Sequence, residues 1–150
     1  MSIAVAALAL ACGQPAAERD LATPKTTVTT LLRAHRLDRA SADEVRRRMT
    51  ARDSDHGHAI DQALAARCFE DFDPHDPVDH GLQGFVVGAL AAGRDQLEVR
   101  IDGETATVTP GPSSRVVLHR HPDGWKISLA DSVPAGTRER MQALWKRAQR

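Results

Sequence analysis

The sequence predicts an α+β fold, with N-terminal helices packed on a curved antiparallel meander of four or more strands and a C-terminal helix. Apolar residues recur at helical spacing through residues 23–93, alternate with polar residues through residues 95–129, and return to helical spacing after Pro134. Helices followed by a run of hairpin strands are typical of this class, in which the helices cover one face of the sheet. A length of 150 residues suits one such domain.

The first residues are predicted to be an export signal. Residues 3–11 are small and aliphatic without interruption, a length typical of a secretory signal rather than of a membrane span. Ala9-Leu10-Ala11 fits the A-x-A rule for cleavage before Cys12. The same stretch resembles the lipobox of bacterial lipoproteins, which implies that Cys12 carries a diacylglycerol. An unlipidated secreted protein and a buried apolar segment are the alternatives.

The expected division of the chain follows from this signal. Residues 1–11 would be a signal peptide, residues 12–22 a lipid-anchored tether in a bacterial cell envelope, and residues 23–150 the domain. The alternative location is periplasmic or secreted. With Cys12 lipidated, Cys68 has no partner in the chain and is expected to be a buried, inert thiol. Without lipid, the two cysteines are candidates for a disulfide.

The first two helices have clear start signals. Thr23 is a favourable N-cap and Pro24 suits the first helical position, so a helix is expected from here to about Leu37. Ser41 and Glu44 have the spacing of a capping box, in which the hydroxyl and the carboxylate each accept a backbone N–H. A second, short and Arg-rich helix is therefore expected to follow Ser41.

Two more helices are expected before the sheet. Asp55 is a candidate cap for a third helix that ends near Phe69, after which Pro74 and Pro77 predict a loop. A fourth helix is expected to stop at Gly93. The apolar residues on its predicted buried face are Leu82, Phe85, Val86, Ala89 and Leu90.

The strands are predicted from alternation and turn signals. Residues 97–101 alternate, and Asp102-Gly103 is a strong hairpin signal before a return strand. Residues 115–121 and 125–129 form a second predicted hairpin around residues 122–124.

A last helix is expected to open at Pro134. The residues that share its apolar face are Met141, Leu144, Trp145 and Ala148. Trp145 and Trp125, which falls on the predicted fourth strand, are both expected to anchor the core.

Two stretches resemble a known superfamily. They are the opening helix, TPKTTVTTLLRAH, and the closing hairpin, RVVLHRHPDGWKISLADSVP. Together they resemble the nuclear transport factor 2-like superfamily, and particularly its small bacterial lipoproteins. The resemblance implies a cone-shaped α+β fold with Trp125 packed into the cone. It implies no particular activity, because that fold is shared by enzymes, ligand-binding modules and subunits.

Composition excludes several classes of protein. Lys plus Arg total 20 and Asp plus Glu total 20, so there is no global basic field for binding nucleic acid. No apolar run reaches the roughly 18 residues that a spanning helix needs, which excludes a multi-span transporter or channel. Glycine loops for phosphate and nucleophile motifs are also absent from the sequence, so no cofactor is expected.

The segment 70–81, EDFDPHDPVDHG, has the most unusual local composition. Carboxylate and imidazole groups are ligands for zinc, manganese and nickel, although the spacing matches neither a calcium loop nor an HExxH helix. The weak candidate metal ligands are Asp71, Asp73, His75, Asp76, Asp79 and His80. We favour the alternative that this is a solvated acidic loop whose carboxylates offset the Arg-rich segment at residues 33–52.

His119 and His121 lie two residues apart on a predicted strand, so both rings should leave the same face of the sheet. In a pocket they could act as a catalytic base, but the sequence places no acid beside them, and a polar sheet face is the simpler interpretation.

These patterns predict a non-enzymatic cell-envelope lipoprotein, held to a membrane by Cys12, whose domain binds a small apolar ligand or an envelope partner protein. The alternatives are an envelope isomerase or dehydratase that uses His119, His121 and a loop carboxylate, and a divalent-metal-binding module at residues 71–80.

Overall fold

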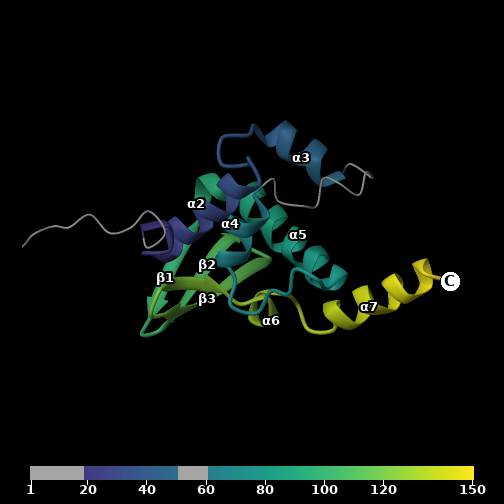
Figure 1. Ribbon diagram of the computed structural model, residues 1–150. Coiled ribbons are helices and arrows are strands. Elements are labelled where there is room, and N and C mark those ends of the chain that lie inside the picture. Colours follow the sequence, from purple (N-terminus) through teal and green to yellow (C-terminus); the bar gives the residue numbers. More distant parts are fainter. Residues whose placement is uncertain (1–18, 51–60) are drawn as a thin grey trace, which may run out of the picture.

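The computed structural model describes residues 19–50 and 61–150, and it has the α+β architecture that the sequence predicts (Figure 1). Helices come first, the sheet follows, and the last helix closes the chain. The early helices are α2 (Pro24–Ala34), α3 (Ala42–Thr50), α4 (Gln62–Arg67) and α5 (Pro77–Ala92), followed by the short 3-10 helix η1 (Arg94–Gln96). The strands are β1 (Glu98–Asp102), β2 (Thr105–Gly111), β3 (Ser114–His121) and β4 (Gly124–Ile127), and the late helices are α6 (Leu129–Ser132) and α7 (Thr137–Ala148).

The strands form one antiparallel meander in the order β1-β2-β3-β4. Leu118 on β3 lies opposite Ala106 on β2 and Ile127 on β4, and all three are buried. Since side chains alternate across a strand, these residues define the face of the sheet that packs against α2 and α5. The core is largely aliphatic, in keeping with a sequence in which aromatic residues make up only 3%.

Helix α2 begins as the sequence predicted. Thr23 caps it, and Thr26 completes a capping box with Thr23. The helix ends at Ala34 rather than near Leu37, because Arg36 adopts a left-handed conformation (φ 53°). The N–H of Leu37 then donates to the carbonyl of Leu32 at 2.8 Å, which is the pattern of a Schellman C-cap.

Two predicted boundaries of the next helices are wrong. Asp61 caps α4, which begins at Gln62, and the expected cap Asp55 lies outside the described residues. Pro77 occupies the first turn of α5 instead of a loop, because Asp76 accepts the N–H of Val78 as N-cap. Gly93 ends α5 as predicted, and a side-chain carbon there would lie 2.0 Å from the carbonyl oxygen of Pro110.

Part of the predicted tether belongs to the domain. Leu21 is fully buried, and its carbonyl accepts the N–H of Trp125 at 2.8 Å. Asp20 forms an ion pair with Arg33 on α2 at 2.9 Å. Asp20 and Leu21 therefore pack with the domain that was expected to start at residue 23, while residues 1–18 lie outside the described part of the chain.

Some predicted core residues are exposed. Trp125 is buried, but Trp145 is 45% exposed and Phe85 on α5 is 44% exposed. Trp145 remains accessible because α7 projects away from the body of the molecule (Figure 1). Phe85 remains accessible because it borders an open groove, described next.

Candidate functional site

A groove of about 550 Å³ runs between α3 and α5. Its walls are mostly small and apolar, because α5 presents glycine and alanine toward it. A side-chain carbon added to Gly84 would meet no atom within 4 Å, so this glycine faces open space. The apolar wall includes Val45, Gly84, Phe85, Gly88, Ala89 and Ala92.

Two arginines lie at the groove. The guanidinium of Arg94 donates to the carbonyl of Leu37 at 2.5 Å, which fixes this side chain against the end of α2. The Nη1 atom of Arg46, on α3, lies 3.2 Å from the Oδ1 atom of Asp43. Apolar walls with a few fixed polar groups are typical of sites for small molecules, and guanidinium groups favour a ligand with an anionic end.

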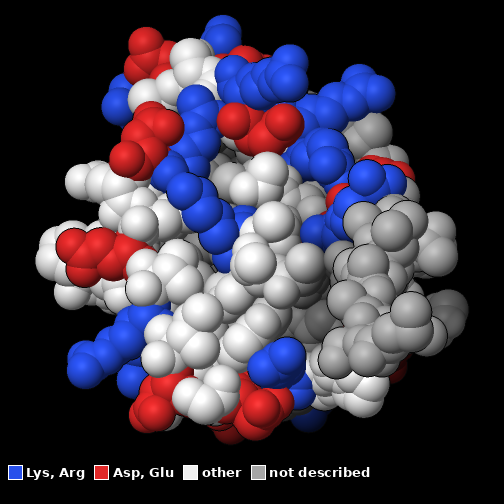
Figure 2. Space-filling view, turned by 90° about the vertical axis from the view of Figure 1, so that its left-hand side faces the viewer, with Lys and Arg blue, Asp and Glu red and all other residues white. Residues whose placement is uncertain are grey.

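Among the described residues, two arginines of the Arg-rich segment pair with acidic residues of their own helix. Figure 2 shows Lys and Arg side chains gathered at the top of the view, at the height of α3, with Asp and Glu among them. Arg48 pairs with Glu44 at 2.7 Å, within α3, as Arg46 does with Asp43. The capping-box prediction holds for Ser41, whose hydroxyl accepts the N–H of Glu44.

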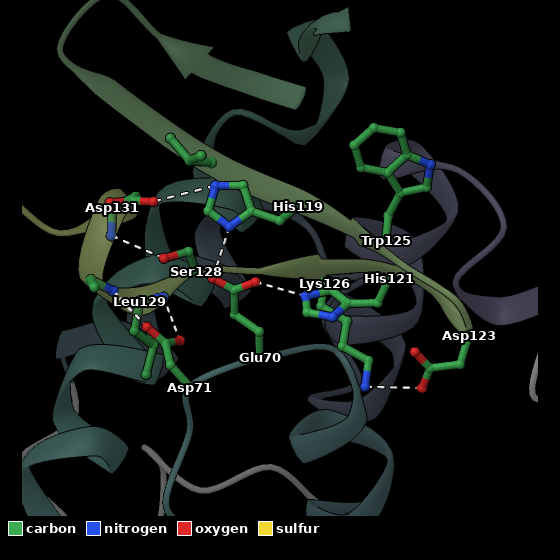
Figure 3. A network of polar contacts seen from close by, with 12 residues as sticks. Glu70, Asp71, His119, His121, Asp123, Trp125, Lys126, Ser128, Leu129 and Asp131 are labelled. Carbon is green, nitrogen blue, oxygen red and sulfur yellow. Dashed lines mark hydrogen bonds and ion pairs between the residues drawn. The ribbon is translucent and has the colours of Figure 1, made fainter. Parts of the chain in front are cut away.

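A second polar cluster lies on the other face of the sheet, where His119 and His121 project together as predicted (Figure 3). Each ring contacts a different oxygen of the Glu70 carboxylate, His119 Nδ1 at 2.8 Å and His121 Nε2 at 2.7 Å. Because an ionised carboxylate only accepts hydrogen bonds, both of these nitrogens carry the proton. Asp131 of α6 lies 3.4 Å from the Nε2 atom of His119.

Glu70 is the acid partner that the sequence could not place. Partial burial raises the pKa of its carboxyl, but the hydrogen bonds and charges of His121 and His119 outweigh this effect, so the pKa lies below its ordinary value. A carboxylate bonded to imidazole is a unit used in acid–base catalysis. Here, however, the carboxylate bridges both rings, and neither ring lines the groove between α3 and α5.

The acidic segment 70–81 is only partly solvated, which corrects the favoured interpretation. Asp71 accepts the N–H groups of Leu129 and Ala130, at 2.8 and 2.9 Å, at the start of α6. Asp79 is buried and accepts from the Arg138 guanidinium at 2.7 Å. Its other oxygen accepts the N–H of Asp73 at 2.8 Å.

Of the remaining candidate ligands of this segment, the side chains of Asp73, Asp76 and His80 also have structural partners. Asp73 accepts the N–H of His75 at 2.8 Å, and the Nε2 atom of His80 lies 2.8 Å from the carbonyl of Pro74. Among the described residues, no group of three or more His, Cys, Asp or Glu side chains is arranged to hold a metal ion. The segment therefore shapes the loop and caps α5 and α6.

Cys68 is buried, as the sequence predicted. Burial raises the pKa of its thiol to about 12, so the thiol is protonated at neutral pH and is a poor nucleophile. Cys12 lies outside the described residues.

Sequence reasoning missed the main features of both sites. The Glu70 contact joins residues 49 and 51 positions apart in the chain, which no local pattern reveals. Gly84 and Gly88 line the groove, but no pattern in the sequence indicated that this side of the helix is open.

Comparison with known proteins adds no family to this description. No family model matches the chain, and no curated protein or solved structure matches it either. In the described part of the chain, no helix combines the length and hydropathy that crossing a membrane requires.

Proposed function

We propose that this chain is a non-enzymatic cell-envelope lipoprotein, anchored through Cys12, whose domain binds a small apolar ligand in the groove between α3 and α5. The observation that carries the binding role is the groove itself, with about 550 Å³ of space between small apolar side chains. This volume falls in the range of small-molecule sites, roughly 300–1,000 Å³. Arg46 and Arg94 favour a ligand with a carboxylate or phosphate end.

The anchoring part of the proposal is supported by the sequence alone. Residues 3–11 form a short apolar segment, and Ala9-Leu10-Ala11 precedes Cys12. The test is the intact mass of the mature protein extracted from its native envelope in detergent. A mass that starts at Cys12 and includes a diacylglycerol supports the anchor, whereas an unmodified Cys12 or retained residues 1–11 would refute it.

The binding role is tested by filling the groove. Gly84→Leu extends a side chain into the groove from a position where an added Cβ atom would meet no atom within 4 Å, and it replaces glycine inside a helix, so the fold should become more stable. Laurate serves as the probe, and isothermal calorimetry measures its affinity for the parent and the variant. We expect affinity to fall by about tenfold or more, since the side chain takes the space of the ligand.

Two controls separate the possible outcomes. Thermal unfolding of Gly84→Leu should show a melting temperature at or above that of the parent, which excludes loss of binding by unfolding. Dodecanol, which lacks the carboxylate, should bind more weakly than laurate if the arginines contribute. Equal laurate affinity in parent and variant, or no laurate binding to the parent, would contradict the proposed site.

A further inference from the structure

The C-terminal helix α7 carries an apolar face that no other element among residues 19–50 and 61–150 covers. Met141 at its first turns packs near Gly81 of α5, and Arg138 bonds to Asp79. Beyond this point every residue from 142 to 150 is exposed. Leu144 is 63% exposed and Trp145 is 45% exposed, although both continue the apolar face that Met141 begins.

The position of α7 leaves that face open. The helix leaves the body of the molecule, and the C-terminal end lies away from the sheet and from the other helices (Figure 1). A helix whose apolar face packs against nothing is marginally stable in water, because propensity alone supports it. The outer half of α7 would therefore gain stability from an apolar phase that covers Leu144 and Trp145.

The charges around this face identify the kind of partner. Residues 140–150 contain four basic residues and no acidic residue. Arg140 and Arg147 are the helical neighbours of Leu144, four residues before and three residues after it, so they border the apolar face. Long basic side chains at such a border reach toward phosphate groups while Leu and Trp enter the headgroup region.

We propose that α7 lies on an anionic bilayer surface, with Leu144 and Trp145 inserted at the level of the headgroups and its basic residues on lipid phosphates. The proposal gains weight from the proposed function, because an anchor at Cys12 would hold the domain at a membrane where a weak interfacial contact is sufficient. A second copy of the chain is disfavoured as the occupant, because the basic residues around the face would repel one another.

The test uses the full chain with Cys12→Ser, so that no lipid modification contributes to binding. Sedimentation with vesicles of phosphatidylcholine, with and without phosphatidylglycerol, compares this chain with the same chain carrying Leu144→Ser and Trp145→Ser. We expect binding that requires phosphatidylglycerol and falls by about tenfold or more in the α7 variant, since most of the insertable apolar area is lost. Both side chains are exposed, so the fold should be unaffected, which circular dichroism and thermal unfolding check.

A spectroscopic measurement locates the contact. Lipids brominated near the headgroup should quench Trp145 and leave the buried Trp125 unchanged, so Trp145→Phe should remove the quenching but keep binding. Equal vesicle binding with and without the Leu144 and Trp145 substitutions would overturn the proposal, as would dimers formed through α7 without vesicle binding. Gly84→Leu should not change vesicle binding, so failure here is distinguishable from failure of the groove proposal.

Discussion

His35 is a buried residue whose protonation opposes folding. Burial lowers the pKa of its ring to about 4 from the ordinary value of 6.5, and its Nε2 atom has no hydrogen-bond partner within the described part of the chain. Between these two values the unfolded chain binds a proton that the folded chain does not. Stability is therefore expected to decrease as the pH falls from 6.5 to about 4 and to change no further from this group below that range.

The loss attributable to His35 should be about 3.5 kcal/mol at most, since the two pKa values differ by about 2.5 and one pKa unit corresponds to about 1.4 kcal/mol. Chemical denaturation at a series of pH values measures it. His35→Gln cannot titrate, so its stability should be flatter between pH 6.5 and 4 than that of the parent. A variant with an unchanged slope in this range would show that His35 is accessible to protons in the folded state.

At the scale of elements, a few residues determine where each helix begins and ends. The sequence predicts the roles of some of these residues but not of others. Thr23 and Ser41 act as the predicted caps, because a cap is a local interaction that a short motif encodes. The end of α2 was less predictable, since Arg36 occupies a left-handed position that glycine usually fills.

Arg36→Gly should stabilise the protein. The φ angle of 53° at this position costs a residue with a side chain about 1–2 kcal/mol, and the greater freedom of glycine in the unfolded chain returns about 0.5–1 kcal/mol of that. The expected gain is about 0.5–1 kcal/mol, visible as a higher midpoint in urea. Arg33→Gly, within the helix, is the matched control and should destabilise. A lower midpoint for Arg36→Gly would contradict this account.

At the scale of the whole molecule, Glu70 joins parts of the chain that are distant in sequence. Residues 69 and 70 run beside β4, where Phe69 bridges to Ile127, and the Glu70 carboxylate reaches both histidines of β3. His119 also approaches Asp131, so the same cluster touches α6 (Figure 3). The cluster therefore links the connection before α5 to the end of the sheet.

Glu70→Gln should destabilise this link by about 1 kcal/mol at neutral pH, because two charge-assisted hydrogen bonds weaken. The pKa of Glu70 in the folded protein lies below its ordinary value of 4.5. The ionised carboxylate therefore stabilises the folded protein above pH 4.5, and this stabilisation is lost as the pH falls through the lowered pKa. The variant should therefore lose less stability below pH 4.5 than the parent. Glu98→Gln on the exposed strand β1 is the control for replacing a carboxylate by an amide, and it should leave the stability at neutral pH nearly unchanged.

The sequence by itself determined the fold class, the order of the longer helices and of the strands, the caps at Thr23 and Ser41 and the burial of Cys68 and Trp125. These features follow from periodicity and short motifs, which act between residues close in the chain. The sequence did not predict α6, where Leu129 was expected to end the last strand, and it placed the start of the last helix at Pro134 although α7 begins at Thr137. Tertiary structure alone decided that Leu21 joins the core, that Glu70 meets His119 and His121, and that the glycines of α5 border a groove. The tertiary structure also left Trp145 exposed. An apolar stripe predicts which face of a helix is suited to burial, but not whether another element covers that face.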